Sequence, residues 1–147
     1  MDLYQLLRQD HLKAKRLFER LAETADGASK ARQRLFTELR QELELHTQVE
    51  EAHFYPALER HEEASELVED ALDEHDEMKQ LLEALDSADA DEDGWFDQLA
   101  DLQEEVEAHV EEEETRLFPV AQKLLQKPEA DAIAQAIEQE KAAAKAR

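Results

Sequence analysis

One eleven-residue motif occurs twice in this chain, and this repetition restricts the folds that the chain can adopt. HTQVEEAHFYP begins at His46 and HVEEEETRLFP begins at His109, 63 positions later. Each copy has a histidine, a glutamate four residues later, a second glutamate beside it and a terminal proline. Two shorter elements, QDH ending at His11 and DEH ending at His75, repeat with almost the same separation. This period is too long for a stacked solenoid, so it indicates a duplicated pair of helices.

Composition and periodicity predict helices almost throughout. The 147 residues include only two Gly and three Pro, whereas good helix formers such as Ala, Leu, Glu and Lys are abundant. Apolar residues recur at helical spacing in four segments, Leu3 to Leu21, Leu35 to Phe54, Leu67 to Leu85 and Trp95 to Leu117. Four amphipathic helices with short connections predict an all-α protein with an up-down-up-down four-helix bundle.

The last part of the chain lies outside this pattern. Pro128 suits the first turn of a further helix, in which Ile133 and Ile137 form a thin apolar stripe. This helix could dock on the bundle, pair with another copy or fray. We therefore expect a bundle over residues 1–125 and a C-terminal extension with one short extra helix over residues 126–147.

Net charge and the absence of cysteine exclude several functions. A formal charge of −22 repels phosphate backbones and anionic lipids, so neither nucleic acid nor a membrane is expected as a partner. Without cysteine, disulfides, thiolate zinc sites and iron–sulfur clusters are excluded. The polar-interrupted N-terminus is typical of neither a signal peptide nor a membrane span. A cytoplasmic monomer or homodimer is the resulting expectation.

Each apolar stripe leads to a histidine, because helical residues three or four apart share a face. On the second and fourth helices a glutamate follows four residues after that histidine. The six polar residues expected to face the core are His11, His46, Glu50, His75, His109 and Glu113. Any one such histidine alone is more often a satisfied core residue, but one on every helix is a joint pattern.

Metal ions are the simplest way to satisfy these groups. A carboxylate inside a bundle must be paired, protonated or bound to a metal. Lys79, one turn after His75, is the best internal partner, but one lysine does not satisfy six groups. Imidazole and carboxylate ligands suit iron or manganese, with zinc as an alternative. Six ligands fill only part of two six-coordinate shells, which leaves room for water or an external ligand such as dioxygen.

Four nearby residues could take part less directly. Glu42 and Glu105 lie one turn before the histidines of the two long motifs and could accept their second ring N–H, although surface positions are the alternative. His53 shares the inward face, but its counterpart in the repeat is an arginine, which favours an outer or surface position. Tyr55 is expected in the core, where its hydroxyl could reach a bound ligand.

The two long motifs and the QDH and DEH elements together resemble the hemerythrin-like HHE cation-binding domain, over about the first 125 residues. The resemblance implies a four-helix bundle holding two non-haem iron ions joined by an oxo or hydroxo bridge. It implies interaction with dioxygen, peroxide or nitric oxide in sensing, detoxification or iron handling. The nitrogen ligands that it implies are His11, His46, His75 and His109, and the carboxylates, bridging the irons, are Glu50 and Glu113.

Departures from the oxygen-carrying hemerythrins narrow this expectation. Lys79 stands where those proteins have a second histidine on the third helix, and Glu114 stands where they have an aspartate on the fourth. The similarity is therefore to the HHE branch, and reversible oxygen carriage is not expected. A metal-binding protein is expected more than a dedicated enzyme, with oxygen- or peroxide-dependent redox activity left open.

Two other functions compete with this reading. A ferritin-like carboxylate oxidase uses E-x-x-H on two helices, but the chain has it once, from Glu50 to His53, and the second copy ends in Arg116. A metal-free helical interaction module with vestigial histidines is the other alternative. Loss of metal and of colour on purification from iron-supplemented cells would favour that module.

Overall fold

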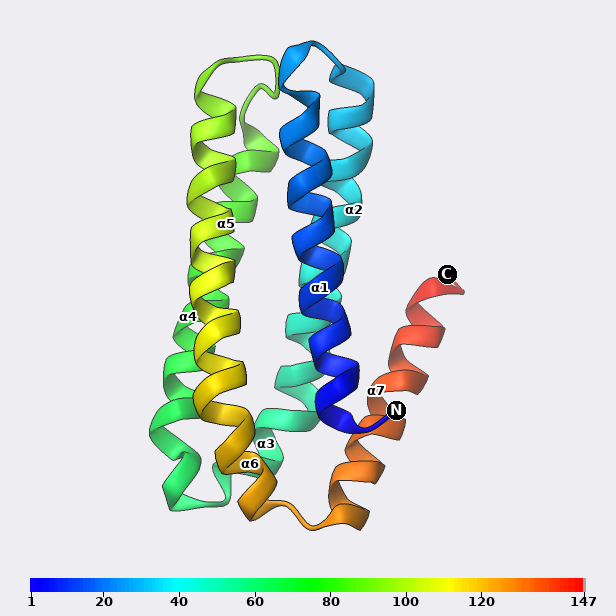
Figure 1. Ribbon diagram of the computed structural model, residues 1–147, viewed down its shortest axis with the longest axis vertical. Helices are drawn as coiled ribbons and strands as arrows, with labels where there is room; N and C mark the ends of the chain where they lie inside the picture. Colours follow the sequence, from blue (N-terminus) through cyan, green and yellow to red (C-terminus); the bar gives the residue numbers. More distant parts are fainter. Residues whose placement is uncertain (147) are drawn as a thin grey trace.

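The computed structural model describes residues 1–146, and these residues are helical almost throughout, without a strand (Figure 1). The predicted all-α class is confirmed. The long helices are α1 (Leu3–Ala22), α2 (Ser29–Val49), α4 (Glu62–Ser87), α5 (Gly94–Glu112) and α7 (Lys127–Lys145). Two short helices, α3 (Tyr55–Glu59) and α6 (Phe118–Leu124), continue α2 and α5. Among residues 1–146, no helix has the length and apolarity that a membrane span requires.

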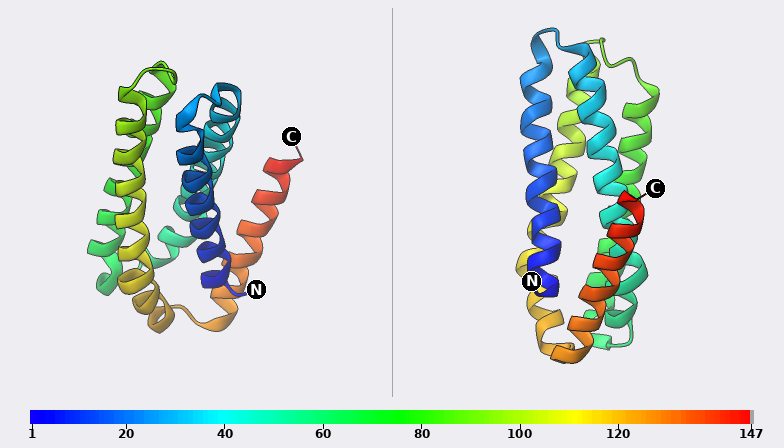
Figure 2. Two further views of the ribbon diagram at one scale, coloured as in Figure 1. Left: turned by 45° about the horizontal axis from the view of Figure 1, so that its top comes forward. Right: turned by 90° about the vertical axis from the view of Figure 1, so that its right-hand side faces the viewer.

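The helices form two hairpins that correspond to the two copies of the duplication. α1 packs against α2 and α4 packs against α5. The loops that close these hairpins lie at one end of the molecule, and the α3–α4 connection lies at the other (Figure 1). The two hairpins lie side by side in Figure 1 and in the left view of Figure 2, and one in front of the other in the right view of Figure 2.

The two hairpins consist of four helical rods: α1, α2 continued by α3, α4, and α5 continued by α6. The apolar core is divided into two clusters along these rods. On α1, Leu7 belongs to one cluster and Ala14 to the other, and on α4 the same holds for Ala71 and Met78. Buried histidines lie in the sequence between the members of each pair. A polar layer therefore separates two apolar halves, each stabilised by burial of leucine and aromatic side chains.

Both prolines of the long motifs lie inside continuous rods. The sequence predicts that Pro56 and Pro119 end or kink their helices, but each helix continues past its proline for several residues. A π-helical turn precedes each proline, η2 (Glu50–Phe54) before the first and η3 (Glu113–Leu117) before the second. The wider turn accommodates a residue that has no N–H to donate.

The π-helical turns also aim side chains at the polar layer. The backbone N–H of Tyr55 donates to the carbonyl oxygen of Glu50, and that of Phe118 donates to the carbonyl oxygen of Glu113. Each bond spans five residues, so residues five apart come to share a face. Tyr55 is thereby directed to the same side as Glu50.

The C-terminal helix α7 docks on the first hairpin. It contacts α1, α2 and η2 and runs beside the first hairpin (Figures 1 and 2). Ile133 and Ile137 are buried in the apolar cluster that includes Leu3. At 19 residues α7 is as long as α5, so the expected short helix is in fact a full-length one. Arg147, at the end of the expected extension, lies outside the described residues.

The turn between α1 and α2 supplies a test of the fold. Gly27 has φ of +104°, in the left-handed region, and no atom lies within 4 Å of an added Cβ. Replacing Gly27 with alanine should therefore lower the free energy of unfolding by about 1–2 kcal/mol, from backbone strain alone. Chemical denaturation measures the change. Gly94→Ala is the matched control, because its surroundings are equally open and its φ is ordinary; equal losses in the two variants would contradict the expectation.

Candidate metal centre

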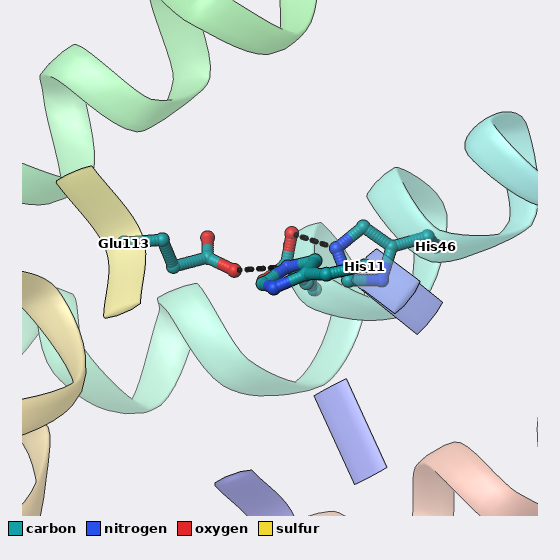
Figure 3. A group of neighbouring side chains, drawn as sticks. His11, His46 and Glu113 are labelled. Atoms are coloured by element: carbon teal, nitrogen blue, oxygen red, sulfur yellow. Dashed lines mark hydrogen bonds and ion pairs between the residues drawn. The ribbon is translucent and has the colours of Figure 1, made fainter. Parts of the chain in front are cut away.

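The structure brings the six predicted polar residues together between the four rods. Each is at most 8% exposed, although all six are ionisable. They come from α1, α2 with η2, α4, and α5 with η3, so every rod contributes. Figure 3 shows part of this layer, in which the side chain of His11 lies between His46 and Glu113. The six residues are His11, His46, Glu50, His75, His109 and Glu113.

These residues form two overlapping groups with the chemistry of metal sites. In each group the potential ligand atoms all lie within 4.8 Å of one another. Two histidines are specific to each group, whereas Glu50 and Glu113 belong to both. The arrangement can therefore hold a cation at either of two adjacent positions, with two carboxylates between them. The first group is His11, His46, Glu50 and Glu113, and the second is Glu50, His75, His109 and Glu113.

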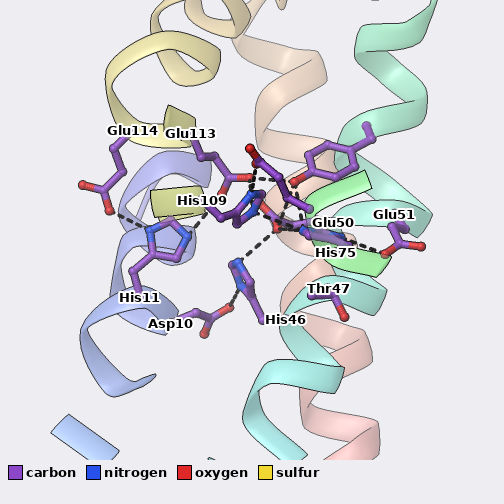
Figure 4. Close-up of polar contacts among 12 residues, drawn as sticks. Asp10, His11, His46, Thr47, Glu50, Glu51, His75, His109, Glu113 and Glu114 are labelled. Atoms are coloured by element: carbon purple, nitrogen blue, oxygen red, sulfur yellow. Dashed lines mark hydrogen bonds and ion pairs between the residues drawn. The ribbon is translucent and has the colours of Figure 1, made fainter. Parts of the chain in front are cut away.

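All four imidazole rings present the same nitrogen, Nδ1, to an outer carboxylate. Each Nδ1 lies 2.6–2.8 Å from a carboxylate oxygen on the outer side of the layer (Figure 4). The four outer carboxylates are Glu114 beside His11, Asp10 beside His46, Glu51 beside His75 and Glu74 beside His109. With Nδ1–H donating outwards, the lone pair of each Nε2 is directed into the centre, where a metal ligand needs it.

The inner atoms are close but incompletely satisfied. His46 Nε2 lies 3.0 Å from Glu50 Oε1, and His11 Nε2 lies 3.2 Å from Glu113 Oε1. The contact between His46 and Glu50 is an ion-pair contact and not a hydrogen bond. Both His46 Nε2 and Glu50 Oε2 are therefore buried without a hydrogen-bond partner. An unsatisfied buried polar atom costs about 1–3 kcal/mol. A bound cation would satisfy both atoms, so the residues present fit a metal.

The outer carboxylates are exchanged between helices. Asp10 precedes His11 on α1 but accepts from His46 on α2, and Glu74 precedes His75 on α4 but accepts from His109 on α5. Each hairpin is thus cross-linked by a carboxylate next to one histidine and bonded to the other. The DH and EH dipeptides are the sequence signal for this arrangement.

A second pair of outer carboxylates connects the two hairpins. Glu51, directly after Glu50, accepts from His75, and Glu114, directly after Glu113, accepts from the histidine on α1. The doubled glutamate of each long motif therefore has two roles: its first member faces the centre and its second orients a ring on another hairpin.

The residues expected to orient the histidines do not do so. Glu42 instead pairs with Lys13 at 2.7 Å, and Glu105 does not reach His109, whose Nδ1 is bonded to Glu74. A neighbouring helix supplies each acceptor instead, Asp10 for His46 and Glu74 for His109.

Two further residues lie outside the centre. His53 Nε2 lies 3.0 Å from Glu140 on α7, on the outer side of η2. Lys79, the expected internal partner of the carboxylates, is 48% exposed in its side chain and lies 3.6 Å from Glu51. Neither side chain therefore neutralises Glu50 or Glu113.

Tyr55 is the additional member of the polar layer. Its side chain is 1% exposed, and its hydroxyl donates to Glu113 Oε2 at 2.6 Å. The hydroxyl oxygen of Tyr55 also lies 3.2 Å from His75 Nε2. Burial first, and then the charges of Glu113 and Glu50, raise the pKa of Tyr55 well above its usual value, so the phenol stays a donor. Its counterpart in the repeat, Phe118, has no hydroxyl, which makes the two halves unequal.

Charges in the layer are strongly coupled. Burial alone would lower the pKa of His109, but hydrogen bonds to Glu113 and Glu74 raise it to about 10. Burial would raise the pKa of Glu113, yet its bonds to His109 and His11 hold it well below its usual value. Without a cation, the carboxylates therefore favour a proton on His109, and a metal bound there must displace that proton.

A small enclosed cavity borders the centre. Its volume is about 10 Å³, and three of the histidines line it together with Asp10, Glu42 and several apolar side chains. This is room for about one water-sized molecule. Its apolar lining includes Ala14, Leu43, Met78, Val106 and Val110.

Comparison with known proteins adds to this geometry. The family model described as hemerythrin HHE cation binding domain matches residues 2–121. A solved structure from Mycobacterium kansasii, of a hemerythrin HHE cation binding domain-containing protein, is 27% identical with a TM-score of 0.84. The match covers 98% of this chain and 90% of that one. A search of curated protein sequences finds no match.

Proposed function

Because this chain belongs to the hemerythrin HHE cation binding domain family, we propose that it holds two non-haem iron ions in an up-down-up-down bundle. His11 and His46 would hold one ion, His75 and His109 would hold the other, and Glu50 and Glu113 would be shared between them. Manganese or zinc is the alternative metal for this donor set. The observation that carries the proposal is that every one of the four rings has Nδ1 bonded outwards and Nε2 directed inwards.

We propose that the bound metals interact with dioxygen, peroxide or nitric oxide, and that the protein acts in sensing, detoxification or iron handling. Bound iron would supply electron-transfer and ligand-binding chemistry toward such molecules. The chain's own residues orient the rings, through the four outer carboxylates, and hold a proton at the Tyr55 hydroxyl. The small cavity beside His11, His46 and His109 has room for about one water-sized molecule next to the proposed metals.

The competing functions have less support. A ferritin-like oxidase would need His53 at the centre, but its ring bonds to Glu140 on α7, and the corresponding Arg116 side chain is 68% exposed. A metal-free module would leave His46 Nε2 and Glu50 Oε2 buried without partners.

Other features of the proposal follow from the sequence. The bundle of residues 1–125 and the extension of residues 126–147 are proposed as its two parts. A cytoplasmic monomer or homodimer is proposed, with neither nucleic acid nor membrane as a partner, because of the net charge of −22.

Iron loading tests the function directly. The protein is loaded with ferrous iron anaerobically, desalted and examined by elemental analysis and absorption spectroscopy, before and after exposure to air, peroxide and nitric oxide. We expect about two iron ions per chain, from two groups of ligands, and a spectrum that changes with at least one of the three. A colourless protein without bound metal, whose thermal stability is unaffected by chelator, would instead support the metal-free module.

A further inference from the structure

Helix α7 reaches the surroundings of the metal centre through two adjacent side chains. Glu140 accepts from His53 on η2 at 3.0 Å, and Lys141 pairs with Asp10 on α1. The buried Ile133 and Ile137 hold this helix on the first hairpin. α7 therefore bridges the two elements that carry His11 and Glu50.

Lys141 belongs to a continuous chain of contacts that ends at a candidate ligand. Its ammonium group donates to Asp10 Oδ1, while Asp10 Oδ2 lies 2.7 Å from His46 Nδ1. The side chains of Lys141, Asp10 and His46 are 15%, 11% and 6% exposed. Because little water screens these groups, a charge on one of them acts strongly on the next.

The other outer carboxylates have weaker counter-charges. Glu51 has Lys79 at 3.6 Å and Glu114 has Arg8 at 4.0 Å, and both of these cations are more than 40% exposed. Within residues 1–146, Glu74 has no lysine or arginine partner. In the duplication Glu74 is the counterpart of Asp10, so α7 adds a largely covered cation, 15% exposed, to one of two otherwise equivalent positions.

The physical consequence is a difference between the two pairs of histidines. Lys141 draws on the same carboxylate that accepts from His46, which weakens Asp10 as an acceptor for the Nδ1–H. His46 is then a poorer electron donor through Nε2 than His109, whose acceptor Glu74 has no such partner.

We propose that α7 influences the metal centre through Lys141, and that Lys141 is a positioning residue for His46, acting through Asp10. By this contact, the half-site of His11 and His46 differs from that of His75 and His109. The inference rests on the proposed metal binding, and it assigns a role to a helix outside the residues that the family model matches.

Proton NMR of the zinc-loaded protein tests this contact. Zinc is diamagnetic, and the four ring Nδ1–H protons, each bonded to a carboxylate, should give separate signals. Asp10→Asn identifies the signal of His46. In Lys141→Gln, which removes the charge but keeps a donor, that signal should move downfield, because Asp10 accepts more strongly. The other three signals should stay in place.

Controls separate the contact from general loosening of the helix. Lys127→Met removes an exposed ion pair between Lys127 and Asp131 of α7 and should move none of the four signals. Lys141→Arg should restore the position of the His46 signal. In the double variant Asp10→Asn with Lys141→Gln, the second substitution should add no further shift, because its effect passes through Asp10.

The outcomes distinguish this inference from the proposed function. Zinc content is measured on every sample first; a wild-type protein that holds no zinc overturns the metal centre itself, and with it the role of Lys141. If zinc is bound and the His46 signal is unmoved in Lys141→Gln, the metal centre stands and the role of α7 is wrong. Equal movement of all four signals also overturns it, because that result reports loss of packing.

Discussion

Replacing Glu113 with glutamine is expected to remove both metal ions, whereas replacing His46 with alanine is expected to remove one. Glu113 belongs to both groups of ligand atoms, but His46 belongs to only one. A neutral carboxamide cannot supply a charged oxygen to each of two cations, as a carboxylate can. Elemental analysis after metal loading and desalting should give about two ions per chain in the wild type, about one in His46→Ala and fewer than one in Glu113→Gln.

Nearby acidic residues provide the control for this comparison. Glu111→Gln changes an exposed member of the same run of glutamates and should leave the metal content unchanged. Glu50→Gln should reproduce the loss seen in Glu113→Gln, because the two glutamates are equivalent in the duplication. Equal metal contents in the histidine and glutamate variants would mean that the carboxylates are not shared.

The inward-facing set was predictable because it depends on local helix geometry. A residue three or four positions along a helix shares the face of its predecessor, whatever the neighbouring helices do. His46 and Glu50 on one rod, and His109 and Glu113 on another, therefore follow from the positions of the leucines before them. The duplication then fixes which members correspond.

The hydrogen-bond acceptors of the rings depend on how neighbouring helices are rotated. Glu42 and Glu105 were predicted from spacing along their own helices, but the acceptors come from adjacent ones. Asp10, for example, is next to His11 in sequence and bonds to His46 across the hairpin. No periodicity within one helix contains that information.

Two other features required the folded chain. The prolines indicate an irregularity, but a π-helical turn and a kink have the same sequence signal, and only the turn brings Tyr55 to the layer. Lys141 lies in an alanine-rich segment in which lysine is ordinarily exposed. Its pairing with Asp10 follows from the docking of α7, which the thin stripe of Ile133 and Ile137 left open.

The metal-free protein is expected to lose stability as pH rises from about 7 to about 9. The pKa of His109 is about 10 in the folded chain, against about 6.5 in an unfolded one. Its contribution to stability is therefore complete below about pH 6.5 and is lost as pH rises through 10. The pKa values of His46 and His75 are raised as well, despite burial, by Glu50 and their outer carboxylates. Each proton involved changes the free energy of unfolding by at most about 1.4 kcal/mol per pH unit.

The metal-loaded protein should respond in the opposite sense. Ligand histidines bind a cation only when Nε2 is deprotonated, so metal affinity, and the stability it adds, should rise with pH. Urea unfolding with excess zinc and with chelator, at several pH values, measures both slopes. In His109→Gln, the free energy of unfolding of the metal-free protein should depend less steeply on pH. The variant lacks the histidine whose pKa is raised at this position. A metal-free protein that grows more stable toward pH 9 would show that the carboxylates do not hold protons on these rings, and that the buried layer is neutralised in another way.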